Sequence, residues 1–497
     1  MGGEVLIAPS EVAEKADPNA RRFPVNAFRF VGNAVFSEQE LQAIVAGHAG
    51  KALNLFDLQK IAHQITEHYR KHGHALSRAV IPAQKIESGV VRIEVVEGKV
   101  GKISVEGNRG YPTEFLAARL RSIADEKAVT VRTLERSLLL LNDMPGLTAR
   151  AVLQPGAQFG TSDLVVQVEE KPVAGSLTLN NHGRDEVGRN RLDGTVEFNN
   201  PFSLGDQLAF RGMYAEDGLL QYARIAYSLP VGNNGTRIGI NHSEVDYDVR
   251  GRFSVLGIEG EAANTEVVMS HPYVRSRTYN LLLGAGLREN RSVQRALGVT
   301  LSDNKIALLS LSALANRIHD NASVTNASVI LSTNFRSNPN GTRQDAQAAK
   351  LDVDVSHLRP VADAWDMFLR GSAAFSADTL ADTEKFSIGG PDSVRGYAAA
   401  EVRGDEGVQG TAELRRRFVA GDMLGVISLF ADSGWVKRKT PGTASPTDAL
   451  GAYGVGLTLF PAKQFRAKLE YARRAGGHAA SDGRNDGRWW LNFTGTF

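Results

Sequence analysis

One arginine and one aspartate stand in settings that favour a specific ion pair. The stretch 387–397 contains the turn sequence Gly389-Gly390-Pro391 and then Arg395 between an apolar residue and an aromatic one. Further along, Asp432 is the carboxylate of an otherwise apolar segment. A planar guanidinium can grip a carboxylate through two parallel hydrogen bonds. We therefore predict that Arg395 meets Asp432. Flanking residues complete the two motifs: Val394, Gly396 and Tyr397 in the first, and Phe430 and Gly434 in the second.

Histidines and aspartates raise metal binding as a second chemistry. Four histidines gather around one predicted helix: His63, His68, His72 and His74. His68 and His72, one helical turn apart, could hold zinc, but an exposed polar helix face is the preferred interpretation. Asp352 and Asp354 alternate on a strand without a calcium-loop signature. We predict no metal site and no cofactor.

The composition argues against several classes of function. The 497-residue chain has no cysteine, which excludes disulfides, zinc–thiolate sites and cysteine nucleophiles. The net charge of +2 provides no bulk field for nucleic acid. The sequence contains no phosphate loop, nucleophile elbow or dinucleotide fingerprint. We predict that the protein is not an enzyme and binds no nucleic acid.

Hydropathy predicts no transmembrane helix. The mean hydropathy is −0.21 and no apolar run approaches the length of a membrane-spanning helix. A transmembrane barrel is still possible, because its strands alternate apolar and polar residues and contain no long apolar run. The N-terminus lacks the basic and apolar regions of a signal peptide. The chain is thus either cytoplasmic or a mature form, and its strands favour the mature form.

After a polar leader at residues 1–23, two small modules follow at residues 24–99 and 100–172, each expected as β-α-α-β-β. In the first, segment 28–36 is a strand that ends at a Gly-Asn turn, and Ser37 and Glu40 form a capping box. A second helix follows Asp57 and ends at Gly73 as C-cap. Strands at about 75–83 and 90–96 close the module.

The same order recurs in the second module. A strand at 103–108 is followed by helices at 113–123 and 130–142, and by strands at 148–154 and 164–168. An exposed strand edge in either module invites pairing with an extended peptide. The alternative is that the modules are rigid spacers.

Residues 173–497 predict a closed barrel of about sixteen strands, so the fold class is mainly β. Segments alternate with period 2, and short turns alternate with long polar loops, which is typical of outer-membrane barrels. Short turns are expected near Pro201, Pro230, Pro272, Asp320, Pro360, Gly421 and Pro461. Long loops are expected near 184–190, 250–262, 290–304, 334–349, 377–408, 437–448 and 475–488.

The charged faces of these strands should line a wet lumen. Charges at mid-membrane on the lipid face cost roughly 2–4 kcal/mol each. We therefore place four charged residues inside: Arg415, Arg417, Lys468 and Glu470. Glu413 lies on the same face of its strand as Arg415 and Arg417. The last strand ends on an aromatic, with Trp489, Leu491, Phe493 and Phe497 on one face.

The combination resembles the outer-membrane transporters of two-partner secretion, which export haemolysins, filamentous haemagglutinins and related exoproteins. The resemblance covers about residues 24–497 and rests on the two modules, the barrel, and the motifs around Arg395 and Asp432. The modules resemble POTRA domains, a name for polypeptide-transport-associated. The resemblance implies that the loop at about 377–408 folds into the pore, where residues 394–397 regulate its opening and Asp432 receives Arg395. Family members commonly begin with a plug helix, of which residues 10–16 are the one candidate here.

The resemblance also implies partners and a location. The modules would face the periplasm and bind an unfolded, β-rich exoprotein, which crosses the bacterial outer membrane through the barrel. The barrel would contact lipid, meet the barrel-assembly machinery through Phe497 and work as a monomer. Three alternatives stay open: an insertase that folds other barrels, a passive porin with anchoring modules, and a soluble enzyme. The sequence does not identify the exported partner.

Overall fold

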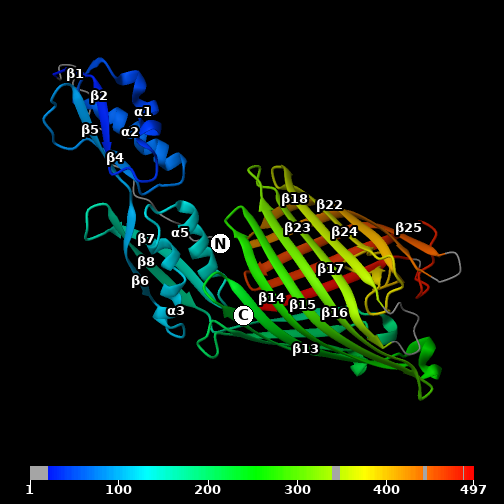
Figure 1. The fold of residues 1–497 in the computed structure, drawn as a ribbon. Coiled ribbons are helices and arrows are strands. Elements are labelled where there is room, and N and C mark those ends of the chain that lie inside the picture. Colours follow the sequence, from blue (N-terminus) through cyan, green and yellow to red (C-terminus); the bar gives the residue numbers. More distant parts are fainter. Residues whose placement is uncertain (1–20, 339–346, 440–444, 485) are drawn as a thin grey trace. The chain divides into compact units, whose positions relative to one another are not determined.

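A computed structural model describes residues 21–338, 347–439, 445–484 and 486–497. The chain separates into two compact units, Met1–Glu170 and Lys171–Phe497 (Figure 1). The predicted leader and plug helix lie, up to residue 20, outside the described residues. None of the described helices is both long and apolar enough to span a bilayer. The finer boundaries of the two modules stay predictions.

The first unit contains two three-stranded sheets with the same topology. In each, the first strand pairs in parallel with the third, and the second strand lies at the edge: the orders are β2-β5-β4 and β6-β8-β7. The elements of the first half are β1 (Phe23–Val25), β2 (Ala27–Val31), α1 (Glu38–Val45), β3 (Lys51–Leu53), α2 (Leu55–Lys71), β4 (Arg78–Val80) and β5 (Val90–Val96). Those of the second are β6 (Lys99–Glu106), α3 (Thr113–Ala118), α4 (Arg121–Ala124), α5 (Val131–Asn142), β7 (Leu147–Pro155) and β8 (Thr161–Glu170).

Local capping corrects two predicted helix boundaries. The prediction that the second helix starts after Asp57 is wrong, because Asn54 is the N-cap and Asp57 returns its bond in a complete capping box. That helix ends at Lys71, so His72 is the C-cap and Gly73 follows it. At α1, the Ser37 side chain accepts the Glu40 N–H, which is the first half of the predicted capping box.

A glycine-containing turn is built in the same way in both halves. Gly32 and Gly107 have positive φ, and a Cβ at either position would lie within 2.5 Å of a neighbouring carbonyl oxygen. Only glycine fits such a close approach. A glutamate then binds the backbone after each turn: Glu97 accepts from Ala34 and Val35, both at 2.7 Å.

Glu170 is the counterpart of Glu97 in the second half. Its carboxylate accepts three backbone N–H groups, those of Arg109, Gly110 and Tyr111, at 2.8–3.2 Å. Although burial opposes the effect, these bonds lower the pKa of Glu170 below its ordinary value. In the first half, burial and a hydrogen bond to Glu97 raise the pKa of the Tyr69 phenol.

The second unit is a closed barrel of sixteen antiparallel strands, as predicted (Figure 1). Its strands are β9 (Val173–Asn180), β10 (Arg191–Asn199), β11 (Gln207–Ala215), β12 (Leu220–Val231), β13 (Thr236–Asp248), β14 (Glu259–Arg275), β15 (Tyr279–Ala296), β16 (Val299–Ile318), β17 (Val324–Asn338), β18 (Ala349–Ala362), β19 (Trp365–Phe375), β22 (Glu406–Ala420), β23 (Met423–Lys437), β24 (Thr447–Ala462), β25 (Phe465–Ala475) and β26 (Arg488–Thr496).

The seven predicted short turns are all present, but the predicted long loop at 290–304 is not. The predicted loops near 334–349 and 437–448 lie partly outside the described residues. Instead of a loop at 290–304, β15 and β16 continue to a tight turn at Leu297 and Gly298. Both residues have positive φ, which suits the turns that match strand twist in a hairpin. The polar residues that suggested a loop belong to strands instead.

Strand register separates an apolar outer face from a polar inner one. Exposed apolar residues occupy alternate positions, for example Leu311, Leu331 and Leu429. The intervening residues of each strand face inward. One of them is Asp354, next to the outward Val355, and its carboxylate binds Arg370. The alternation is the pattern of a membrane-spanning barrel with a wet interior.

The first and last strands close the barrel through a short ladder. Only five residue pairs, from Asn492↔Asn180 to Thr496↔Ser176, join β26 to β9. Asn181 extends this seam, since its side chain binds backbone groups of Trp489 and Leu491 at 3.0 and 2.8 Å. At the other end, Phe497 exchanges two backbone bonds with Gly175.

Replacing Glu170 with Gln tests the turn built on this carboxylate. The amide keeps one acceptor oxygen, loses the charge and turns its own N–H donors toward one of the N–H groups, so we expect the helical unit to lose about 1–3 kcal/mol of unfolding free energy. A lowered pKa in the folded state means that the carboxylate stabilises above its unfolded pKa, about 4.3. This contribution disappears as pH falls through the lower, folded pKa.

The measurement is urea unfolding of the full chain, followed by the far-ultraviolet helix signal at neutral and acidic pH. All described α-helices belong to the first unit, so the signal reports mainly on that unit. Equal stability of wild type and Glu170→Gln at neutral pH would contradict the expectation.

Candidate functional site

The segment 376–405, between β19 and β22, folds back against the inner wall of the barrel. It was predicted to lack strands, but β20 (Phe386–Ile388) and β21 (Val402–Gly404) pair as a short hairpin. We call residues 376–405 the pore loop. Contacts on opposite parts of the wall hold it in place.

One end of the pore loop is anchored on β15 and β16. Ala381 packs against Ile306 and Leu308, whose exposed fractions are 4% and 6%. Close by, the Glu384 carboxylate binds Arg288 at 2.7 Å and Asn290 at 2.8 Å. An apolar contact and an ion pair thus fix the segment before the tip.

The tip residues are buried in an apolar cluster on the other side. Val394 and Tyr397 are fully buried together with Ile388 of β20 and Val436 of β23. Gly396 lies so close to the wall that a Cβ would approach Ala452 to 3.0 Å. The tip therefore lies flat against the strands, which leaves Arg395 aimed at them.

Arg395 grips Asp432 through a two-pronged ion pair. Its Nε lies 2.8 Å and its Nη2 2.7 Å from the two carboxylate oxygens of Asp432. The backbone N–H of Arg395 donates to the same carboxylate at 3.1 Å. Both side chains are almost completely buried. The geometry is the bidentate one that gives guanidinium pairs their directionality.

Two further carboxylates share the remaining nitrogen of Arg395. Nη1 lies 2.7 Å from Glu413 on β22 and 2.8 Å from Glu470 on β25. Each of these glutamates also has a second cation: Arg415 bonds Glu413 at 2.6 Å, and Lys468 bonds Glu470 at 2.9 Å. Three acidic and three basic side chains therefore balance in one cluster.

Aromatic side chains complete the surroundings of Arg395. The guanidinium carbon lies 3.3 Å from the centroid of the Phe430 ring, in a cation–π contact. Trp490 of β26 donates its indole N–H to the Arg395 carbonyl at 2.8 Å. A cation–π contact of this kind in a desolvated site contributes about 2 kcal/mol.

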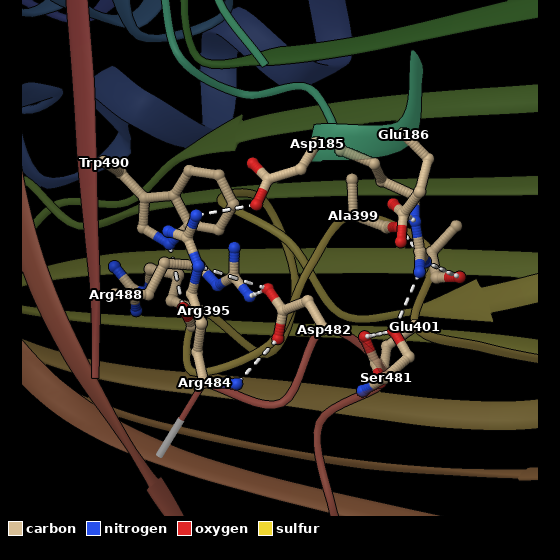
Figure 2. Close-up of polar contacts among 12 residues, drawn as sticks. Asp185, Glu186, Arg395, Ala399, Glu401, Ser481, Asp482, Arg484, Arg488 and Trp490 are labelled. Atoms are coloured by element: carbon tan, nitrogen blue, oxygen red, sulfur yellow. Dashed lines mark hydrogen bonds and ion pairs between the residues drawn. The ribbon is translucent and has the colours of Figure 1, made fainter. Parts of the chain in front are cut away.

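A second polar network ties the pore loop to the loops beside the seam (Figure 2). Arg184, from the loop after β9, donates to the carbonyl oxygens of Ala399 and Ala400 and to Ser481. Glu401 of the pore loop accepts from the Ser481 hydroxyl at 2.9 Å.

An ion pair joins the loop after β9 directly to the loop before β26. Arg484, from the loop before β26, binds Asp185 at 2.6 Å, and Figure 2 shows both beside Asp482. Asp482 in turn bonds Arg488 at the start of β26. The three loops at this end of the barrel are therefore connected by charge-assisted hydrogen bonds.

The structure brings together all seven residues singled out from the two motifs, but it adds partners that the motifs lacked. Glu470 had been placed in the lumen, and Glu413 on the same face as Arg415, without a link to Arg395. Nothing in the sequence pointed to a contact between Trp490 and the pore loop. The link needed the register between strands, which no single segment contains.

The remaining candidates have structural contacts. Asp352 and Asp354 face the lumen and pair with Lys350 and Arg370. The exposed-face prediction agrees with His63 and His72 but is wrong for His68, which is partly buried. The rings of His68 and His72 lie 4.6 and 5.1 Å from that of Phe36 and so cover part of this aromatic side chain.

Comparison with known proteins gives consistent matches. The profile of the haemolysin secretion/activation protein ShlB/FhaC/HecB family matches residues 160–459, and that of the ShlB-type POTRA domain matches residues 23–98. The heme/hemopexin transporter protein HuxB of Haemophilus influenzae is 25% identical over 96% of this chain and 87% of HuxB. The outer membrane transporter CdiB of Escherichia coli is 26% identical over 83% of this chain and 73% of CdiB.

Solved structures show the same fold. CdiB from Escherichia coli superposes with a TM-score of 0.79 at 22% identity, covering 99% of this chain and 93% of CdiB. BamA from Haemophilus ducreyi lacking POTRA domains 1–3 gives a TM-score of 0.58 at 15% identity, covering 96% of this chain and all of that one. At these identities the likeness shows architecture alone.

Replacing Arg395 with Ala should release the pore loop. The change leaves Asp432 and two neighbouring glutamates with one cation fewer, and breaking a buried ion pair costs about 3–5 kcal/mol. We expect faster hydrogen exchange at residues 386–404 and altered open-state statistics in single-channel recordings of the purified protein.

The matched control is Arg211→Ala. Arg211 also contacts both oxygens of a lumen carboxylate, Asp193, through Nε and Nη2, but its side chain is 47% exposed and lies outside the pore loop. Exchange rates and recordings for Arg395→Ala that coincide with those of Arg211→Ala would show that this arginine does not hold the loop.

Proposed function

Because the chain belongs to the haemolysin secretion/activation protein family ShlB/FhaC/HecB, we propose that it exports its own large, β-rich exoprotein through the bacterial outer membrane. The barrel lies in that membrane, and the POTRA domains are periplasmic. Relatives in this family are two-partner secretion transporters. The observation that supports export most directly is a closed barrel whose lumen holds a loop fastened to the wall by polar and ionic contacts.

The competing functions have less support. The likeness to BamA is confined to the fold, so it gives no argument for an insertase. A passive porin would not need a loop fastened by buried charges on the wall. The family match therefore decides in favour of export.

We place capture of the exoprotein at the open edge of β7. The side chain of Asn142 binds both the N–H and the C=O of Ala149, so these groups point away from β8. In an antiparallel ladder the same orientation returns at every second residue, here Ala151 and Leu153. No described side chain caps these two positions. Their backbone groups are free to pair with an extended peptide.

The corresponding edge in the first half is blunted. β4 spans only Arg78–Val80, and the Ala79 N–H is already bound by the Thr66 hydroxyl at 2.9 Å. Beyond β4, the Gln84 amide binds both backbone groups of Arg92, each at 2.7 Å. Side chains thus occupy the sites that a peptide would need.

The pore loop serves as the gate in this proposal. Its contacts combine burial, which holds the closed state, with hydrogen bonds that water and substrate can replace. The proposal also includes a monomeric transporter without enzymatic activity, recognised by the barrel-assembly machinery through Phe497.

Deleting the gene in its host tests the proposed function. We expect one large protein to vanish from the culture supernatant and cell surface, because its export route is gone, while other barrels persist. Mass spectrometry of supernatant and outer-membrane fractions is the measurement, with the complemented strain as control. A joint decrease of barrel proteins would indicate an insertase, and a loss of small-solute uptake alone would indicate a porin.

Replacing Leu153 with Pro in the complementing copy tests the capture edge. Proline removes the outward N–H yet is tolerated at a strand edge, so the sheet should persist while peptide pairing weakens. We expect severalfold less exported partner than with Leu153→Ala, which loses similar packing but keeps the N–H. Equal export by the two variants, at equal amounts of transporter in the membrane, would exclude this edge.

A further inference from the structure

A row of polar residues crosses the outer face of the barrel close to its periplasmic turns. Strand register aligns Tyr279 of β15 with Arg317 of β16, Arg317 with Thr325 of β17, and Thr325 with His357 of β18. Arg359 lies two residues beyond His357 on the same face of β18. The row is therefore continuous over four neighbouring strands.

These side chains face the membrane and not the lumen. Along β16 to β18, the same alternation exposes Leu311, Leu331 and Val355 on the outside. The opposite positions face inward, where Leu308 contacts the pore loop. No register shift separates Leu311 from Arg317 or Val355 from His357.

The row lies at the level of lipid headgroups. Arg317 is next to the end of β16, and the short periplasmic turn to β17 follows. From Leu311 to Arg317 the strand advances about 20 Å, or about 14 Å in height for a tilt near 45°. Tyr279, 39% exposed beside Arg317, suits the aromatic girdle at this interface.

A recess of about 780 Å³ opens between these residues. The Thr325 hydroxyl lies 2.9 Å from both His319 Nε2 and His357 Nδ1, which fixes the two imidazoles on one side. The residues that give the recess its polarity are Tyr279, Arg317, His319, Asp320, His357 and Arg359. Two arginines and two histidines thus face a single carboxylate.

The two guanidiniums are available to a ligand. Arg317 and Arg359 are exposed, and within the described part of the chain neither makes an ion pair or hydrogen bond. Most other described lumen and loop arginines, such as Arg211 and Arg370, have carboxylate partners. Elsewhere around the same end of the barrel the outward residues include the aromatics Phe198, Phe465 and Phe493. Arg416, an exposed outward arginine of β22, lies over the Trp365 ring of the neighbouring β19. The positive charge is therefore concentrated on one side.

We propose that this recess binds the phosphate of an anionic phospholipid from the periplasmic leaflet of the outer membrane. Arginine forks match phosphate oxygens, and basic pockets at headgroup level select anionic lipids. Tyr279 would lie along the glycerol region, and the apolar wall above it would meet the acyl chains. A lipid held here would fix the orientation of this side of the barrel in the membrane.

The test is native mass spectrometry of the purified full-length protein in detergent with added lipid. Phosphatidylglycerol should bind about tenfold more tightly than zwitterionic phosphatidylethanolamine, because the two arginines act on its net charge. The double variant Arg317→Gln/Arg359→Gln should lose that preference. The matched control Arg473→Gln removes an outward, exposed arginine at the opposite end of the barrel and should keep it.

Each other outcome contradicts the proposal. Equal binding of the two lipids by the wild type would show that the wall merely takes up acyl chains. Displacement of phosphatidylglycerol by millimolar inorganic phosphate would show a site for free phosphate. An equal loss in Arg473→Gln would show a general charge effect. The wild-type comparison of lipids needs no variant, so it stands even if the double variant folds poorly.

Discussion

A charge removed from water has to be paired, and the pore loop depends on that constraint at Arg395. The guanidinium is 3% exposed and contacts three carboxylates, on β22, β23 and β25. The three carboxylates meet at one place on the barrel wall, so the Arg395 side chain is fully paired only when the loop lies in this position. The apolar packing of Val394 and Tyr397 then has a defined register, since the arginine between them is fixed.

The same cluster is arranged so that its parts can separate. Glu413 and Glu470 keep Arg415 and Lys468 as cations of their own, and Asp432 keeps the Thr411 hydroxyl. Arg415 and Lys468 are 29% and 38% exposed, so water reaches the rim of the cluster. If the loop left the wall, as proposed, the wall carboxylates would stay partly compensated and the released arginine would be solvated. The contact would thus be strong in the closed state without leaving an isolated buried charge in the open one.

The sequence determines most of the barrel because its physical signals are local. Alternation predicts each strand, and residues such as Pro201 or Gly421 predict its turns. The hairpin of β15 and β16 escaped prediction because strands that extend beyond the membrane are polar on both faces, which removes the alternation. Glu413 and Glu470 were visible as inward charges, yet their partner depends on the register of separate strands. The motifs shared with two-partner secretion transporters suggested the pair of Arg395 and Asp432, but the other two carboxylates required the folded wall.

The position of the pore loop and the closure of the barrel share hydrogen bonds. Trp490, on the last strand, donates its buried N–H to the Arg395 carbonyl, and Arg184, after the first strand, donates to the carbonyl oxygens of residues 399 and 400. The seam between those strands has only five ladder pairs, so each extra contact is a large part of its total. If the loop departs, both donors must find water or an entering peptide. The loop therefore contributes to the seam while it lies in the pore, and under the proposed function an entering chain that took over those donors would replace that contribution.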